Sequence, residues 1–82
     1  PQLDRVFSAL SDATRRGLIA RLHGAPDATV SELARPLPIS LPAVMKHLDV
    51  LEGAGLIARA KRGRTVHVRL TPAPLEDAAA WL

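Results

Sequence analysis

The chain has 82 residues, 48% of them hydrophobic and 2% aromatic, with a formal net charge of +3 and a sequence pI of about 10.6. This length predicts one small domain over residues 1–82 with a modest core. Cysteine is absent, which excludes disulfides, thiolate metal sites and thiol nucleophiles and fits a cytoplasmic protein.

Two amphipathic helices are predicted at the start of the chain. Apolar residues at helical spacing predict a first helix over about 2–10. Ser11 or Asp12 then caps a second helix, which stops at His23 and Gly24. The apolar residues that define these helices are Leu3, Val6, Phe7 and Leu10 in the first, and Leu18, Ile19 and Leu22 in the second.

A helix-turn-helix is predicted over about 30–53. Thr29 and Glu32 form a capping box, so a helix opens near Val30, and Pro36 limits it to about two turns. Ser40 caps a second helix, and a proline in its first turn costs no hydrogen bond. That helix continues to Glu52 and meets two glycines, Gly53 and Gly55, of which Gly55 better suits the left-handed position at a helix end.

The second helix of this pair has two faces. Leu41, Val44, Leu48 and Leu51 form the apolar stripe that we expect to dock on the core. Pro42, Met45, Lys46 and Asp49 form the opposite face, which in isolation indicates no more than solvation. A recognition helix presents the first part of its outward face to base edges. The expected groove contacts are therefore Ser40, Leu41, Pro42, Met45, Lys46 and His47, although a histidine between the faces is more often a structural hydrogen-bonding group.

A β-hairpin, the wing, is predicted over about 56–70. Val66, Val68 and Leu70 alternate with polar residues, and Gly63 permits a tight turn. The tip carries three cations, which could serve solubility alone. Directly after a recognition helix, they are expected to contact DNA phosphates. These residues are Lys61, Arg62 and Arg64.

A last helix is predicted over about 73–82, apolar on more than one side. The two terminal helices could cover the core of their own chain, but in so small a domain we favour a homodimer interface formed by the helices over about 2–10 and 73–82. Pairing would place two recognition helices about one DNA turn apart. The expected interface residues are Leu3, Phe7, Leu75, Trp81 and Leu82.

The charge distribution favours an anionic partner. Positive residues cluster at 15–21 and 59–69. Phe7 and Trp81 alone provide no platform for stacking unpaired bases, which favours duplex DNA over single strands. No apolar run approaches about 18 residues, so we expect no membrane partner. The chain begins without methionine and ends within a helical pattern, and we expect further residues beyond both ends.

The sequence resembles the ArsR-type winged-helix transcriptional regulators. The resemblance is carried by LSDATRR at 10–16, VSELA at 30–34, ISLPAV at 39–44, KHL at 46–48, VLE at 50–52 and AGLI at 54–57. It implies a mainly α fold with a small β-hairpin, in the order α-α-α-α-β-β-α. It also implies a homodimeric DNA-binding protein, usually a repressor, that acts on a palindromic operator.

Departures from the family pattern bear on how binding is controlled. The chain lacks the cysteines that metal-sensing relatives carry in the helix corresponding to 30–35. Its histidines lack the helical spacing that would let two share a zinc ion. We therefore expect that the protein binds no metal and no cofactor. The chain resembles the branch of the family that lacks metal-binding cysteines. Met45 replaces a small polar residue, and Asp49 is unusual on a surface that faces phosphates.

We therefore predict a sequence-specific double-stranded DNA-binding regulator, a homodimeric repressor that does not respond to metal. The alternative is a winged helix that binds another protein, which Met45 and Asp49 favour. An enzyme is not expected, because there is no nucleophile elbow, phosphate-binding glycine loop or close pair of acids. A small apolar effector, a protein effector and no effector at all remain alternatives.

Overall fold

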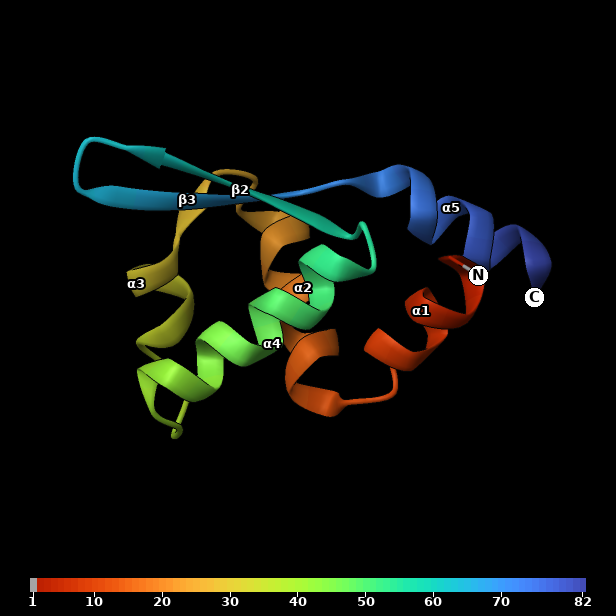
Figure 1. Cartoon of the computed structure of the whole chain (residues 1–82), viewed down its shortest axis with the longest axis horizontal. Helices are drawn as coiled ribbons and strands as arrows, with labels where there is room; N and C mark the ends of the chain where they lie inside the picture. The colour runs from red at the N-terminus through yellow and green to blue at the C-terminus, as the bar shows by residue number, and fades with distance from the viewer. Residues whose placement is uncertain (1) are drawn as a thin grey trace.

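The computed structural model describes residues 2–82 and has the predicted element order, with one short strand in addition (Figure 1). The elements are α1 (Gln2–Ala9), α2 (Ala13–Gly24), β1 (Ala28–Thr29), α3 (Val30–Ala34), α4 (Leu41–Gly53), β2 (Ile57–Arg62), β3 (Thr65–Leu70) and α5 (Pro72–Trp81). Strand β1 was not predicted, because two residues carry no alternation from which a strand could be recognised. Among the helices over residues 2–82, none has the length and apolar composition of a membrane-spanning segment.

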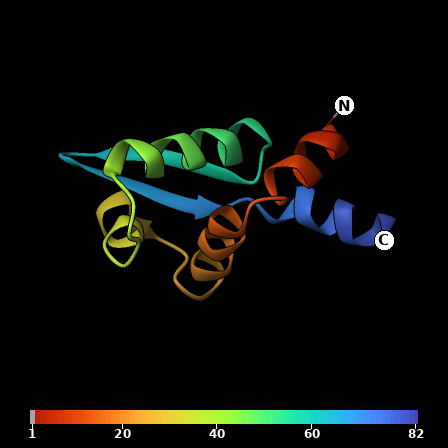
Figure 2. The same ribbon diagram turned by 90° about the horizontal axis from the view of Figure 1, so that it is seen from below.

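The three strands form one antiparallel sheet in the order β1-β3-β2. In the hairpin, Ile57 pairs with Leu70 and Arg62 pairs with Thr65. Figures 1 and 2 show the hairpin projecting at one end of the molecule and α1 beside α5 at the other, along a longest dimension of 37 Å. The sheet and the terminal helices therefore occupy opposite ends.

The core lies where α1, α2, α3 and α4 meet the inner face of the sheet. Its members are apolar and fully buried, and burial of each such side chain contributes about 1.5–3 kcal/mol relative to exposure. The largest are Val6, Leu18, Leu22, Leu33, Val44, Leu48, Leu51, Leu56 and Val68. Since every helix of the helix-turn-helix contributes to this core, the recognition helix is held by side-chain packing.

The end of α4 is fixed by the glycine that the sequence indicated. Gly55 has a φ of 77°, the Leu56 amide donates to the Leu51 carbonyl at 3.0 Å, and the Gly55 amide donates to the Glu52 carbonyl at 2.9 Å. This is the Schellman arrangement, in which a left-handed residue ends the helix. A Cβ at Gly55 would lie 2.8 Å from Gln2 Nε2, so glycine also lets α1 approach this turn closely.

A two-residue loop forms the hairpin tip. Gly63 has a φ of 61°, and Arg64 does not have a positive φ. Glycine at the first of two loop positions is what a type II′ turn requires, and this turn matches the twist of the two strands. The tip is therefore short and places its flanking cations at defined positions.

Candidate nucleic-acid interface

Side-chain caps set the start of both helices in the helix-turn-helix. The Glu32 amide donates to Thr29 Oγ1 at 3.1 Å and the Thr29 amide donates to Glu32 Oε1 at 2.9 Å, so the predicted capping box is present. The hydrogen bond from the Thr29 amide is the main reason why the pKa of Glu32 is lowered. Ser40 caps α4 by accepting from the Ala43 amide at 3.3 Å. Local hydrogen bonds thus fix where the recognition helix begins.

The first turns of α4 present an exposed surface. Pro42 and Lys46 are exposed, and Ser40 is exposed beside them. Leu41 was expected both in the core-facing stripe and in the groove contacts, and the first expectation was wrong, because its side chain is 56% exposed. It is the first residue of the helix and lies beyond the edge of the core, which begins at Val44.

Met45 was expected on the outward face, and this was wrong as well. Its side chain is half-buried and packs against the core cluster. At about 100° per residue, Met45 lies next to Leu48 around the helix, at the edge of the apolar stripe. Its flexible thioether side chain can therefore bend toward the core. Hydrophobic packing therefore accounts for methionine at this position.

His47 joins α4 to the start of α2. Arg15 Nη1 lies 3.2 Å from His47 Nδ1, and a guanidinium has only donors, so the imidazole nitrogen accepts. Asp12 Oδ2 lies 3.8 Å from the same nitrogen and accepts from the Arg15 amide at 3.0 Å. That amide is the main reason why the pKa of Asp12 is lowered. These contacts account for His47 as a structural hydrogen-bonding residue.

The three cations at the wing tip differ in their partners. Lys61 and Arg64 are exposed, and within residues 2–82 no ion pair involves them or Lys46. Arg62 instead donates to both carboxylate oxygens of Asp27, from Nη1 at 2.9 Å and from Nη2 at 3.3 Å. Both side chains are more than half exposed, so water and DNA can compete for this pair.

Asp27 also faces His67 on the outer side of the sheet. The Thr65 hydroxyl donates its one proton to the Arg62 carbonyl, at 3.0 Å. Its oxygen can therefore only accept from His67 Nε2, which lies 3.1 Å away and is the donor of this second hydrogen bond. His67 Nδ1 is buried without a hydrogen bond and lies 3.6 Å from an Asp27 oxygen. The carboxylate of Asp27, just before β1, therefore contacts both Arg62 at the wing tip and His67 on β3.

The sequence did not reveal the role of Arg59. Arg59 Nη2 donates to Asp49 Oδ1 at 2.6 Å and to Glu52 Oε1 at 2.6 Å, and Arg59 Nε donates to Glu52 Oε1 at 2.8 Å. These bonds cross from β2 to α4 and explain why an aspartate is tolerated at position 49. The alternation of the strand could have placed Arg59 on the inner face, but only the packing of β2 on α4 identifies its partners.

The arginines of α2 mostly bind backbone carbonyls, although their cluster was taken to favour an anionic partner. Arg15 Nε donates to the Ala9 carbonyl at 2.7 Å, and Arg16 Nη1 donates to the Leu10 carbonyl at 2.7 Å. Arg21 donates to the carbonyls at the end of α3, those of Glu32 and Leu33. These guanidiniums donate hydrogen bonds to backbone carbonyls at helix ends and in loops of their own chain.

The expected interface residues of the terminal helices fall into two groups. Trp81 is 70% exposed and Leu82 is 89% exposed. Leu3, Phe7 and Leu75 are half-buried and pack against the core of their own chain, and the Phe7 and Trp81 rings meet edge to face at 6.2 Å between centroids. The structure thus leaves an exposed apolar surface at the chain end, supported from below by Phe7.

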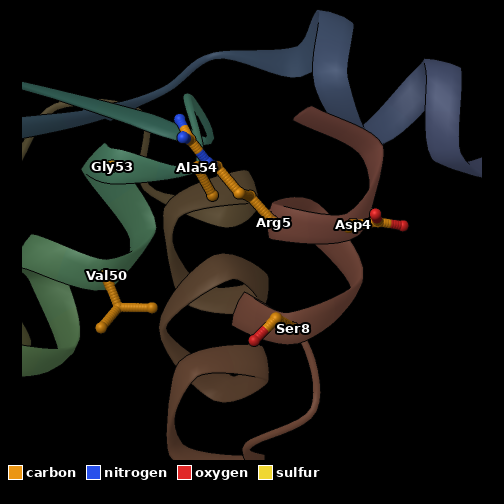
Figure 3. Close-up of a pocket in the computed structure, with 6 residues that line it drawn as sticks. All are labelled: Asp4, Arg5, Ser8, Val50, Gly53 and Ala54. Atoms are coloured by element: carbon orange, nitrogen blue, oxygen red, sulfur yellow. The ribbon is translucent and has the colours of Figure 1, made fainter. Parts of the chain in front are cut away.

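An open groove of about 590 Å³ lies between α1 and the end of α4 (Figure 3). Figure 3 shows Arg5 extending from α1 toward Ala54, whereas Asp4 points away from the groove. The side chain of Val50 is partly exposed in this groove. Within the described residues, no group of three or more histidine, aspartate or glutamate side chains could hold a metal ion.

Comparison with known proteins assigns the fold to a family. The family described as "Helix-turn-helix domain" matches residues 10–60. The HTH-type transcriptional regulator Rv2034 of Mycobacterium tuberculosis is 46% identical over 72 residues, which cover 88% of this chain and 66% of that protein. The transcriptional repressor SdpR of Bacillus subtilis is 32% identical over 80 residues, which cover 98% of this chain and 88% of the repressor.

A solved structure gives the same assignment. The crystal structure of an ArsR family transcriptional regulator is 44% identical and superimposes with a TM-score of 0.91, covering 98% of this chain and 81% of that one. These relatives are transcriptional regulators rather than enzymes. The chain therefore belongs to the ArsR-type winged helix-turn-helix transcriptional regulators.

Proposed function

We propose that this chain is a homodimeric repressor that binds a palindromic double-stranded DNA operator and does not respond to metal. The observation that carries the proposal is that the recognition helix and the wing tip present exposed cations with no carboxylate partner within residues 2–82: Lys46 on α4, and Lys61 and Arg64 at the wing tip. A lysine on the outward face of a recognition helix suits base edges, and cations at a hairpin tip suit phosphates.

The protein-binding alternative loses the two features that favoured it. Met45 packs against the core, and Asp49 pairs with Arg59. Neither residue therefore needs an external polypeptide to explain it. The groove contacts that we retain are Ser40, Leu41, Pro42 and Lys46, whereas the half-buried Met45 and His47 act by positioning the helix.

Dimerisation is supported by the exposed apolar end of α5. An exposed tryptophan, such as Trp81, is suited to serve as a buried anchor in a two-fold interface. A dimer would double the number of recognition helices and so bind two half-sites. The expected result is one sedimenting species of twice the chain mass, and two chains per operator.

Lack of a metal response is supported by the types of residue present. Thiolate ligands are excluded because cysteine is absent, and the described His, Asp and Glu side chains do not gather into a site. Stoichiometric metal in the purified protein, or release of DNA on addition of Zn²⁺, would contradict this part of the proposal.

The deciding experiment is selection of a DNA site from a random pool, followed by binding measurements across salt concentrations. We expect the logarithm of the affinity to fall steeply with the logarithm of salt concentration. The double variant Lys61→Glu with Arg64→Glu should lose roughly tenfold or more on every sequence, because it replaces phosphate contacts by repulsion. Lys46→Ala should instead change the preference among sequences.

Arg69→Glu is the matched control for the single tip variant Arg64→Glu, because both reverse one charge. Arg69 lies in the same hairpin but pairs with Ala58 near its base, away from the tip. It should affect binding much less than the tip variant. Binding without sequence preference, or equal losses at the tip and at Arg69, would reject the proposed interface.

A further inference from the structure

Arg59 differs from the other cations of the hairpin because it is half-buried and pairs with two carboxylates of α4. Its side chain is 18% exposed, and it bridges Asp49 and Glu52, two carboxylates one helical turn apart on α4. Burial lowers the pKa of Arg59, but hydrogen bonds to Asp49 and Glu52 outweigh this effect and leave its pKa raised. The guanidinium is therefore a charged donor to both carboxylates.

One of the bridged carboxylates, that of Asp49, lies on the helix face that we propose for DNA. Asp49 is one turn beyond Lys46, so the two side chains share a face of α4, and the Asp49 side chain is 64% exposed. On β2, Arg59 and Lys61 are two residues apart and point to the same side of the strand. Arg59 thus lies between two acids of the recognition helix and a free cation of the wing.

We propose that Arg59 is a positioning residue that masks Asp49 and Glu52 from DNA phosphates, so that the second half of α4 can approach the strongly negative duplex. The inference rests on the DNA binding proposed above. With Arg59 present, the three side chains sum to one negative charge, and without it they sum to two. Repulsion of phosphate by an uncompensated carboxylate on this face would oppose binding on any sequence.

The test compares three variants in DNA binding at several salt concentrations. Arg59→Met should weaken binding about three- to tenfold at low salt, and the defect should shrink as salt screens the exposed acids. Combining Arg59→Met with Asp49→Asn and Glu52→Gln should restore binding at least to the level of the unaltered protein. The matched control, Arg69→Met, removes the same charge from the opposite face of the hairpin and should lose less.

A purely structural role of Arg59 predicts a different pattern. In that case the triple variant would bind as weakly as Arg59→Met at every salt concentration, and this result would overturn the inference. Equal losses for Arg59→Met and Arg69→Met would also overturn it, because net charge alone would then explain the defect.

One further comparison keeps the test decisive if Arg59→Met alone fails to fold. In the background of Asp49→Asn with Glu52→Gln, which has no acids left to mask, adding Arg59→Met should weaken DNA binding no more than adding Arg69→Met does; a larger loss would contradict masking. Failure of the unaltered protein to bind DNA would reject the proposed function itself. Normal binding together with an unaffected Arg59→Met variant would reject only the role of Arg59.

Discussion

The two ends of the molecule differ in what they leave uncompensated at the surface. At the end formed by α4 and the wing, Lys46, Lys61 and Arg64 are exposed without an ion-pair partner within residues 2–82. The end formed by α1 and α5 (Figure 1) also carries exposed charged residues, but it differs by two large exposed apolar side chains, Trp81 and Leu82. A charged partner suits the first end, and an apolar partner, such as a second copy, suits the other.

The two ends share one core, so a core change should affect both. Leu48, on the core-facing side of α4, is fully buried. Leu48→Ala should lower the free energy of unfolding by about 2–5 kcal/mol, because it leaves a cavity that the surroundings cannot fully close. Urea denaturation would measure this, with Lys46→Ala as the control of unchanged stability. A loss below about 1 kcal/mol would show that the core is more plastic than its burial indicates.

A substitution at the apolar end should weaken dimerisation, whereas a substitution at the charged end should not. Trp81→Ala should weaken dimerisation about tenfold or more, since a large aromatic anchor contributes more than its neighbours. Sedimentation equilibrium would measure the dissociation constant. Lys61→Ala is the control, because it lies at the other end and should leave dimerisation unchanged. An unchanged constant for the tryptophan variant would place the interface elsewhere.

At the charged end, Asp27 should restrain one wing cation. Asp27→Asn frees Arg62 and should strengthen DNA binding up to about threefold, while stability changes by less than about 1 kcal/mol because the pair is exposed. The control Asp4→Asn removes the same charge from α1. Tighter binding by both variants would indicate a general charge effect instead of release of Arg62.

The smallest expected effect is on how the stability of the fold changes at acid pH. The pKa values of Asp12 and Glu32 are lowered in the fold, mainly by the backbone amides of Arg15 and Thr29. Each carboxylate therefore stabilises the fold above the ordinary carboxyl pKa, and this contribution is lost as pH falls below about 4. Urea midpoints measured between about pH 3 and pH 7 should decline less in Asp12→Asn with Glu32→Gln. If the urea midpoint of the double variant falls at acid pH as much as that of the unaltered protein, the loss of stability comes from other titrating groups.

The sequence predicted those features that depend on residues close together in the chain. The capping box at Thr29, the cap at Ser40 and the glycines at 55 and 63 all act within a few residues, and each was predicted from spacing alone. The element order followed from these signals, because together they mark where the α3, α4 and wing elements begin or end.

The sequence could not predict which cations are free. In the sequence, nothing distinguishes Arg59 and Arg62 from Lys61 and Arg64, the cations that have no ion-pair partner within residues 2–82. Arg59 finds its carboxylates because β2 packs against α4, and Arg62 finds Asp27 because the wing lies close to it. The same holds for Leu41 and Met45, whose burial depends on where the core ends along α4. Such properties follow from contacts between distant segments, which periodicity does not encode.

The turn at Gly55 links the two ends mechanically. Gln2 Nε2 donates to the Ala54 carbonyl at 3.4 Å, and the missing side chain of Gly55 leaves room for that contact. A side chain at position 55 would have to displace Gln2 Nε2, and with it the hydrogen bond that joins the start of α1 to the end of the recognition helix.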